Sequence, residues 1–200
     1  MEYLLVVVAY LIGSVPMAIV VARLMKLPDP RTAGSGNPGT TNVLRIGGKT
    51  AAALTLAGDV LKGVIAVVLA RQFTSDAGII AASGMAVFVG HLYPIFFGFQ
   101  GGKGVATALG VWLVIAPGAG ALLLVTWLAM ALLFRYSSLA AIVAAGAAPL
   151  YVAWLAPLTP YLILSVGMSA LLVWRHRANI RNLAAGKESR IRLSRSAEGR

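Results

Sequence analysis

A loop of small polar residues, spanning 31–45, has the composition of a phosphate-binding segment. Gly34, Gly36 and Gly39 permit backbone turns that expose successive N–H groups, and such concave nests bind phosphate. Arg45, at its end, adds a planar cation suited to the same ligand. The neutral hydrogen-bond donors of the loop are Ser35, Asn37, Thr40, Thr41 and Asn42. The alternative interpretation is a polar turn between two helices.

A second glycine-rich segment, spanning 98–107, surrounds a lysine. Gly101, Gly102 and Gly104 flank Lys103 and leave its side chain sterically free. A helix predicted to begin just beyond this segment directs its first N–H groups toward the same place, which favours an anion. The alternative is a lysine that only marks the cytoplasmic side of a membrane. Two anion-suited loops on one face favour the binding-site interpretation.

A third group of polar residues follows the last apolar segment. His176 and Asn179 are three residues apart and share a face if the helix continues, and Gly186 and Glu188 follow them. A histidine there could donate to phosphate or act as a base. The alternative is an interfacial histidine among arginines. His91, within an apolar segment, is interpreted as a structural histidine.

Few charges lie inside the apolar segments. Asp59 and Lys62 are three residues apart, and we interpret them as a mutual ion pair, since intramembrane charges are costly when unpaired. Several motifs are absent: the nucleotide-binding Gly-x-x-x-x-Gly-Lys-Ser/Thr, the acyltransferase His with Asp five positions later, and the hydrolase Gly-x-Ser-x-Gly. With no cysteine, the chain has neither thioester chemistry nor a Cys-based metal site, and no metal or cofactor is predicted.

These residues must be positioned by a membrane protein. The chain has 200 residues, of which 59% are hydrophobic and only 12% charged. A chain of this length has too little interior to bury so much apolar surface, which excludes a soluble enzyme, a disordered tail and a coiled coil. The net charge of +11 does not indicate a nucleic-acid partner, because nucleic-acid binders do not need long uncharged apolar stretches.

The fold class expected is an all-α integral membrane protein with seven transmembrane helices. Residues 105–134 must cross twice although two full crossings need about 40 residues, so the fourth helix is expected to be short. With the N-terminus outside and the C-terminus cytoplasmic, 15 of the 17 basic residues fall on the cytoplasmic side. Residues 1–200 thus form a single polytopic membrane domain with a cytoplasmic loop 22–50 and a cytoplasmic tail 175–200. The predicted spans are 3–21, 51–70, 77–97, 105–115, 119–134, 139–154 and 161–174.

Three motifs resemble a known family, the bacterial acyl-phosphate–glycerol-3-phosphate acyltransferases of the PlsY type, and the likeness covers nearly the whole chain. The motifs are Gly34-Ser-Gly-Asn-Pro-Gly-Thr-Thr-Asn-Val-Leu-Arg45, Gly90-His-Leu-Tyr-Pro with Phe99-Gln-Gly-Gly-Lys-Gly-Val-Ala-Thr107, and His176-Arg-Ala-Asn-Ile-Arg-Asn-Leu with Gly186 and Glu188. Departures are small: Thr40 stands where alanine is usual, and Asn182 stands where arginine is expected, so Asn182 receives no role.

The resemblance implies an enzyme of the bacterial cytoplasmic (inner) membrane with its active site on the cytoplasmic face. The reaction implied is transfer of a fatty acyl group from acyl phosphate to the 1-hydroxyl of sn-glycerol 3-phosphate, giving lysophosphatidic acid and phosphate. This is the first step of bacterial phospholipid synthesis. Its partners would be the two substrates, membrane lipids and the enzyme that produces acyl phosphate.

The two loops and the resemblance together give each candidate residue a role. The acyl-phosphate head is expected to bind a nest made of Ser35, Gly36, Asn37 and Thr41. Glycerol 3-phosphate is expected to contact Arg45, Lys103, Ser138, His176, Asn179 and Glu188. Lys103, His176 and Asn179 are the predicted catalytic residues. The base is either His176 or a phosphate oxygen of the substrate. The alternatives are a phosphate-ester transporter or flippase and a structural membrane subunit.

Overall fold

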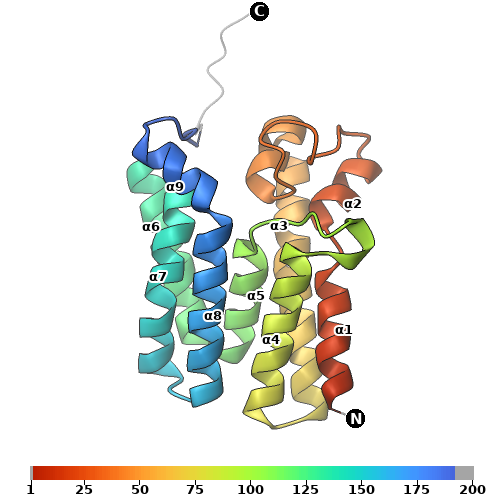
Figure 1. The fold of residues 1–200 in the computed structure, drawn as a ribbon, viewed down its shortest axis with the longest axis vertical. Helices are drawn as coiled ribbons and strands as arrows, with labels where there is room; N and C mark the ends of the chain where they lie inside the picture. Colours follow the sequence, from red (N-terminus) through yellow and green to blue (C-terminus); the bar gives the residue numbers. More distant parts are fainter. Residues whose placement is uncertain (1, 192–200) are drawn as a thin grey trace, which may run out of the picture.

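The computed structural model describes residues 2–191, and every regular element in that part of the chain is a helix. The predicted tail beyond residue 191, with its last three arginines, lies outside the described residues. Most of the helices stand side by side along one long axis (Figure 1). The elements are α1 (Tyr3–Gly13), α2 (Met17–Leu24), α3 (Thr40–Phe73), α4 (Ala77–Leu92), the 3₁₀ helix η1 (Ile95–Phe97), α5 (Val105–Ile115), α6 (Pro117–Phe134), α7 (Ser137–Leu155), α8 (Thr159–Arg175) and α9 (Arg177–Ala184).

Several of the helices have the length and apolar composition of membrane spans. Within the described part, α3, α6, α7 and the α4–η1 segment are each long and apolar enough to cross a bilayer, and α1 with α2 adds one span broken by a 41° bend. Two further apolar helices, α5 and α8, are shorter, with 11 and 17 residues. The short helix predicted at 105–115 therefore has the predicted bounds.

The structure divides two segments differently from the prediction. The predicted single span 3–21 is two helices, because Pro16 has no N–H to donate and the helix ends before it, at Gly13. The predicted loop 22–50 is helical at both ends, since α2 continues to Leu24 and α3 already begins at Thr40. Within α3, Gly48 takes a φ of 78°, which breaks the helix between its first two turns and its membrane-spanning part.

The core is built from closely spaced helices with small residues between them. α3 packs along α5, and a methyl group added to Gly63 or Gly110 would overlap the backbone of the facing helix. Small residues permit such an approach, which supplies the van der Waals contact that joins helices in lipid. The buried apolar side chains of this core include Val67, Phe88 and Val111.

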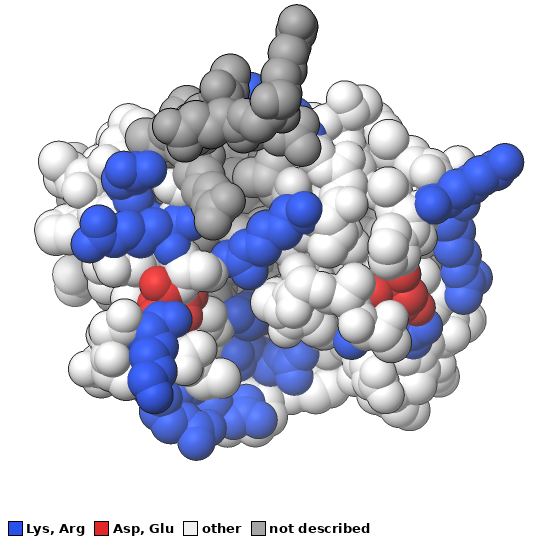
Figure 2. Space-filling view, turned by 90° about the horizontal axis from the view of Figure 1, so that it is seen from above, with Lys and Arg blue, Asp and Glu red and all other residues white. Residues whose placement is uncertain are grey.

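The polar segments gather at one end of the helices. The connection between α2 and α3 and helix α9 lie at the upper end of the molecule in Figure 1, opposite the N-terminus, and the connection between η1 and α5 lies somewhat lower in the same half. Many Lys and Arg side chains lie at this end, and some of them are recessed near its centre (Figure 2). The fold therefore brings together three segments that are far apart in the sequence.

Candidate active site

The loop between α2 and α3 is held in shape by one buried asparagine. The side-chain oxygen of Asn42 accepts a hydrogen bond from the N–H of Ser35 at 2.8 Å. Its amide nitrogen donates to the carbonyls of Pro30 and Ala33, at 2.8 and 2.9 Å. The side chain is 1% exposed, so the prediction of Asn42 as a donor to a ligand is wrong: its amide is already used inside the loop. Gly34, with φ 63°, lies so close that a methyl group there would overlap the Asn42 oxygen.

The loop forms one wall of a cleft of about 310 Å³. Two arginines, Arg31 and Arg175, contribute to its lining, and its remaining residues come from the two glycine-rich segments. Those residues are Ser35, Gly36, Asn37, Pro38, Phe99, Gln100 and Gly101. The structure thus brings the two predicted anion-suited loops together, as the sequence indicates. Thr41 is not part of this lining; its hydroxyl shares a hydrogen bond of 3.1 Å with Ser137 at the start of α7.

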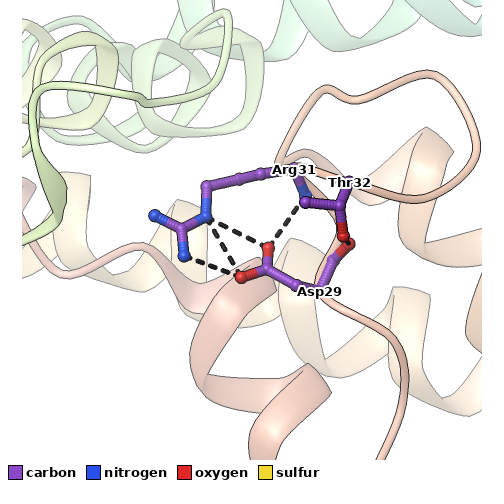
Figure 3. A network of polar contacts seen from close by, with 3 residues as sticks. All are labelled: Asp29, Arg31 and Thr32. Carbon is purple, nitrogen blue, oxygen red and sulfur yellow. Dashed lines mark hydrogen bonds and ion pairs between the residues drawn. The ribbon is translucent and has the colours of Figure 1, made fainter.

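Arg31 is fixed at the cleft by an acidic neighbour (Figure 3). Its Nε lies 3.1 and 3.2 Å from the carboxylate oxygens of Asp29, and its Nη2 donates to the same carboxylate at 2.7 Å. These hydrogen bonds lower the pKa of Asp29, so the pair stays charged. The Nη1 group makes none of these contacts. Arg31 was not predicted as a site residue, because an arginine beside a span is expected on the cytoplasmic side in any case.

Arg175, the last residue of α8, ties that helix to the second loop. Its guanidinium donates to the carbonyl oxygens of Gly101 at 2.8 Å and of Gly102 at 3.0 and 3.2 Å. It also lies over the ring of Tyr93, 5.4 Å from the centroid. Sequence reasoning counted Arg175 only as a tail cation, and no local spacing distinguishes it from its neighbours.

Lys103 takes part in a polar network on the other side of the same loop. Its amine donates to the side-chain oxygen of Asn179 on α9. The amide nitrogen of Asn179 donates to Glu188 at 2.8 Å, and the hydroxyl of Ser138 on α7 donates to the same carboxylate oxygen at 2.7 Å. The structure therefore joins four residues predicted for the glycerol 3-phosphate site. Burial of the ammonium lowers the pKa of Lys103.

His176 lies between α8 and α9 and is 3% exposed. Its Nδ1 is 2.8 Å from the carbonyl oxygen of Leu172. Because a carbonyl only accepts, Nδ1 carries the proton, and Nε2 of the neutral ring is an acceptor. Burial lowers the pKa of His176 to about 4, so the ring is neutral near pH 7. A neutral ring in this tautomer accepts a hydrogen bond at Nε2 and brings no positive charge to a phosphate.

Arg45 reaches the same network from α3. Its Nη2 donates to the hydroxyl of Ser189 at 2.5 Å, directly beside Glu188 in the sequence. Thr41, one turn earlier on the helix, faces α7 through Ser137. The first two turns of α3 therefore lie beside the Lys103 network. The Glu188 carboxylate opposes the effect of burial on the pKa of Lys103, and the positive charges of Arg175 and Arg45 add to it.

Comparison with known proteins identifies the family of the chain that has this arrangement. The family model described as "Glycerol-3-phosphate acyltransferase" matches residues 3–186.

The chain belongs to the glycerol-3-phosphate acyltransferase family.

A relative from Halorhodospira halophila, named glycerol-3-phosphate acyltransferase, is 54% identical over 191 residues, covering 96% of this chain and 97% of the relative. One of the same name from Thiobacillus denitrificans is 55% identical over 196 residues, covering 94% and 96%. The crystal structure of PlsY (YgiH), an integral membrane glycerol 3-phosphate acyltransferase, in its glycerol 3-phosphate form has a TM-score of 0.91 and 41% identity over 96% of each chain. Its lysophosphatidic acid form has a TM-score of 0.88, with 41% identity over 94% of each chain.

The predicted membership in the glycerol-3-phosphate acyltransferase family is confirmed, and with it the prediction of an acyltransferase in a helical integral membrane fold. The transporter and structural-subunit interpretations are set aside. The roles of individual residues in this chain stay predictions, to which the described geometry adds Arg31 and Arg175.

Proposed function

We propose that this chain transfers a fatty acyl group from an acyl phosphate to the 1-hydroxyl of glycerol 3-phosphate, releasing lysophosphatidic acid and phosphate. One observation carries the proposal: two polar regions meet at a single short loop. Gly101 lines the cleft with the two arginines, and Lys103, two residues later, joins the network of Asn179 and Glu188. The reaction needs two phosphate-bearing substrates held side by side, which is what two such regions supply.

The cleft is the proposed site of the acyl-phosphate head. Arg31 and Arg175 lie at its edge, each guanidinium already oriented by protein acceptors, so their charge is available without reorganisation. The N–H groups of Ser35 and Gly36 are already used inside the loop, on the Asn42 side chain and on the carbonyl of Ala33, so the loop would offer the side chains of Ser35 and Asn37 rather than the predicted run of exposed N–H groups. We retain Thr41 as a weaker member of this site, because its hydroxyl faces α7. The acyl chain would lie along the apolar helices.

The Lys103 network is the proposed site of glycerol 3-phosphate. Arg45 and Lys103 would neutralise its phosphate, and Asn179, Ser138 and Glu188 would orient the molecule through hydrogen bonds. Lys103 follows the cleft-lining Gly101 by two residues, and its amine would reach the leaving phosphate from this shared loop and stabilise the charge that develops on it.

The chemistry is one acyl transfer without a covalent enzyme intermediate. The 1-hydroxyl oxygen attacks the acyl carbon, a C–O bond forms, and the bond from that carbon to the phosphate oxygen breaks. We propose that Nε2 of His176 accepts a hydrogen bond from the hydroxyl and orients it. Because the pKa of His176 is about 4, the hydroxyl proton passes to an oxygen of the leaving phosphate, which is the stronger base.

We further propose that the single domain 1–200 crosses the bacterial cytoplasmic membrane seven times with its N-terminus outside. Five segments of the described residues are long and apolar enough to cross, counting the broken α1–α2 pair as one, and the shorter apolar helices α5 and α8 would bring the number of crossings to seven. The crowding of Lys and Arg at one end favours that end as cytoplasmic, where glycerol 3-phosphate is dissolved (Figure 2). Association with the enzyme that makes acyl phosphate would limit hydrolysis of this reactive donor.

The test is phosphate release by the purified protein from palmitoyl phosphate, with and without glycerol 3-phosphate. The proposal expects release that requires glycerol 3-phosphate, with an equal amount of lysophosphatidic acid formed. Hydrolysis without transfer would indicate an acyl-phosphate phosphatase. No release from well-folded protein would overturn acyl phosphate as the donor, and other activated acyl donors would then be tested.

A further inference from the structure

A cluster of ionisable side chains is buried between α3 and α4, below the site. The amine of Lys62 lies 2.8 Å from a carboxylate oxygen of Asp59, and Nδ1 of His91 lies 3.4 Å from the same oxygen. All three side chains are at most 6% exposed. Replacing a buried ion pair with apolar groups of similar volume is often neutral for stability, so stability alone does not account for the cluster.

One side of the cluster supports the break between α1 and α2. The amine of Lys62 donates to the carbonyl oxygen of Val15 at 3.0 Å. The N–H of Ile19, which would bond that carbonyl in an unbroken helix, donates instead to the carbonyl of Pro16 at 2.9 Å. Lys62 therefore satisfies a backbone acceptor that the break exposes, and this contact fixes the lysine and its ion pair in place.

The other side of the cluster supports the loop that carries Lys103. The N–H of Gly102 donates to the carbonyl oxygen of His91 at 3.1 Å. Gly102 also lies so close to the imidazole that an added methyl group would overlap Nε2 of His91. From the opposite side, Arg175 holds the carbonyl of the same glycine. The backbone of Gly102, one residue before Lys103, is thus held by its contacts with His91 and with Arg175.

We propose that Asp59, Lys62 and His91 act as positioning residues that set the backbone at Gly102 and, through it, the place of the Lys103 amine. The Asp59 carboxylate lies 3.4 Å from Nδ1 of His91 and packs against the ring, the ring and the His91 carbonyl contact Gly102, and the next residue extends its amine to Asn179. Displacement by about 1 Å of a group that stabilises developing charge costs on the order of a hundredfold in rate. The inference rests on the proposed role of Lys103.

The test is a double-mutant cycle on kcat with purified full-length protein. The variant Asp59→Asn/Lys62→Met removes both charges at nearly constant volume. It is expected to stay folded and to lower kcat at least tenfold. In a Lys103→Gln background, measured at high enzyme concentration, the same double substitution is expected to change kcat less than twofold, because the amine it positions is gone.

Controls separate positioning from general damage. Ser83→Ala alters another buried polar side chain of α4, away from the loop, and is expected to leave kcat unchanged. If Asp59→Asn/Lys62→Met does not fold, His91→Leu, which keeps the ion pair, is carried through the same cycle with the same expectation. Either variant with kcat within twofold of the parent, or an equal loss in both backgrounds, overturns the proposal. Parent-level activity of Lys103→Gln alone would instead overturn the proposed role of Lys103.

Discussion

The side-chain amine of Lys103 donates a hydrogen bond to the amide oxygen of Asn179, 76 residues further along the chain. This contact joins the loop before α5 to the helix after the last span. Because Asn179 in turn donates to Glu188, the lysine is oriented by groups that have partners of their own. Side chains oriented in this way are suited to binding a substrate in one geometry.

Substitution of Lys103 tests the proposed charge stabilisation. Lys103→Ala is expected to lower kcat at least about tenfold, because the developing charge on the leaving phosphate loses one of the cations proposed to stabilise it. Lysophosphatidic acid formation by the purified variant is the measurement. Lys187→Ala is a matched control, since it removes an exposed lysine near the same end. A variant with the parent's kcat would remove Lys103 from the mechanism.

The Asp29–Arg31 pair predicts an effect on one substrate more than on the other. Arg31→Gln is expected to raise KM for acyl phosphate about tenfold and to change KM for glycerol 3-phosphate less, because the arginine lines only the cleft. Asp29→Asn, which frees the guanidinium to move, is expected to act in the same direction more weakly. Steady-state kinetics with each substrate varied in turn decide this. Equal changes in both KM values contradict the assignment, and Arg177→Gln serves as a charge-matched control.

The buried histidine predicts a pH-dependent stability. The pKa of His176 is about 4 in the folded chain against an ordinary 6.5, so the unfolded chain binds more protons between these values. The contribution is present above about pH 6.5 and is lost as the pH falls toward 4. The unfolding temperature of His176→Gln is therefore expected to fall less than that of the parent over this window. Parallel curves for the two proteins would contradict the shift.

His176 should also matter for the rate. His176→Ala removes the acceptor proposed to orient the attacking hydroxyl, and kcat is expected to fall at least about tenfold at pH 7. Since the proton is proposed to go to phosphate, the pH dependence of kcat near pH 6.5 should be the same in the parent and in His176→Gln. A titration present in the parent and absent from the variant is not expected. Such a titration would make His176 the base.

Substitution of Asn42 is expected to disorder the loop between α2 and α3 and to weaken the binding of acyl phosphate. Asn42→Ala leaves the N–H of Ser35 and the carbonyl of Pro30 without their partner and removes one of two hydrogen bonds to the carbonyl of Ala33, at a cost of about 1–3 kcal/mol. The loop is expected to become more sensitive to protease and KM for acyl phosphate to rise. Thr55→Val, which removes a buried hydrogen bond within α3, is the control for stability alone.

Much of the fold follows from patterns that a sequence displays directly. Uncharged stretches locate the helices, and the distance available between 105 and 134 requires α5 to be short. Lys103, Asn179 and Glu188 were recognisable as partners because their motifs belong to one family. The apolar pattern did not predict the break before Pro16. The stretch is continuously hydrophobic, and the N–H that proline lacks does not change its hydrophobicity.

Some site residues were missed or misplaced because their roles depend on contacts and side-chain directions that the sequence does not display. Arg31 and Arg175 stand where any membrane protein places arginines, so only their contacts with Asp29 and with the glycine carbonyls distinguish them. Thr41 and Asn42 lie in a polar run beside the nest, but the helix that begins at Thr40 turns one toward α7 and the other inward. The direction in which each side chain of such a run points depends on the residue at which the helix begins.

The short separation between Gly101 and Lys103 has a consequence for inhibition. On the proposed assignment, lysophosphatidic acid keeps its headgroup beside Lys103 while its chain still lies along the path used by the donor. A product that spans both regions competes with both substrates. A stable analogue that joins an acyl chain, a phosphonate for the cleft and a glycerol phosphate within one molecule would gain affinity from the linkage itself, since binding one end raises the effective concentration of the other.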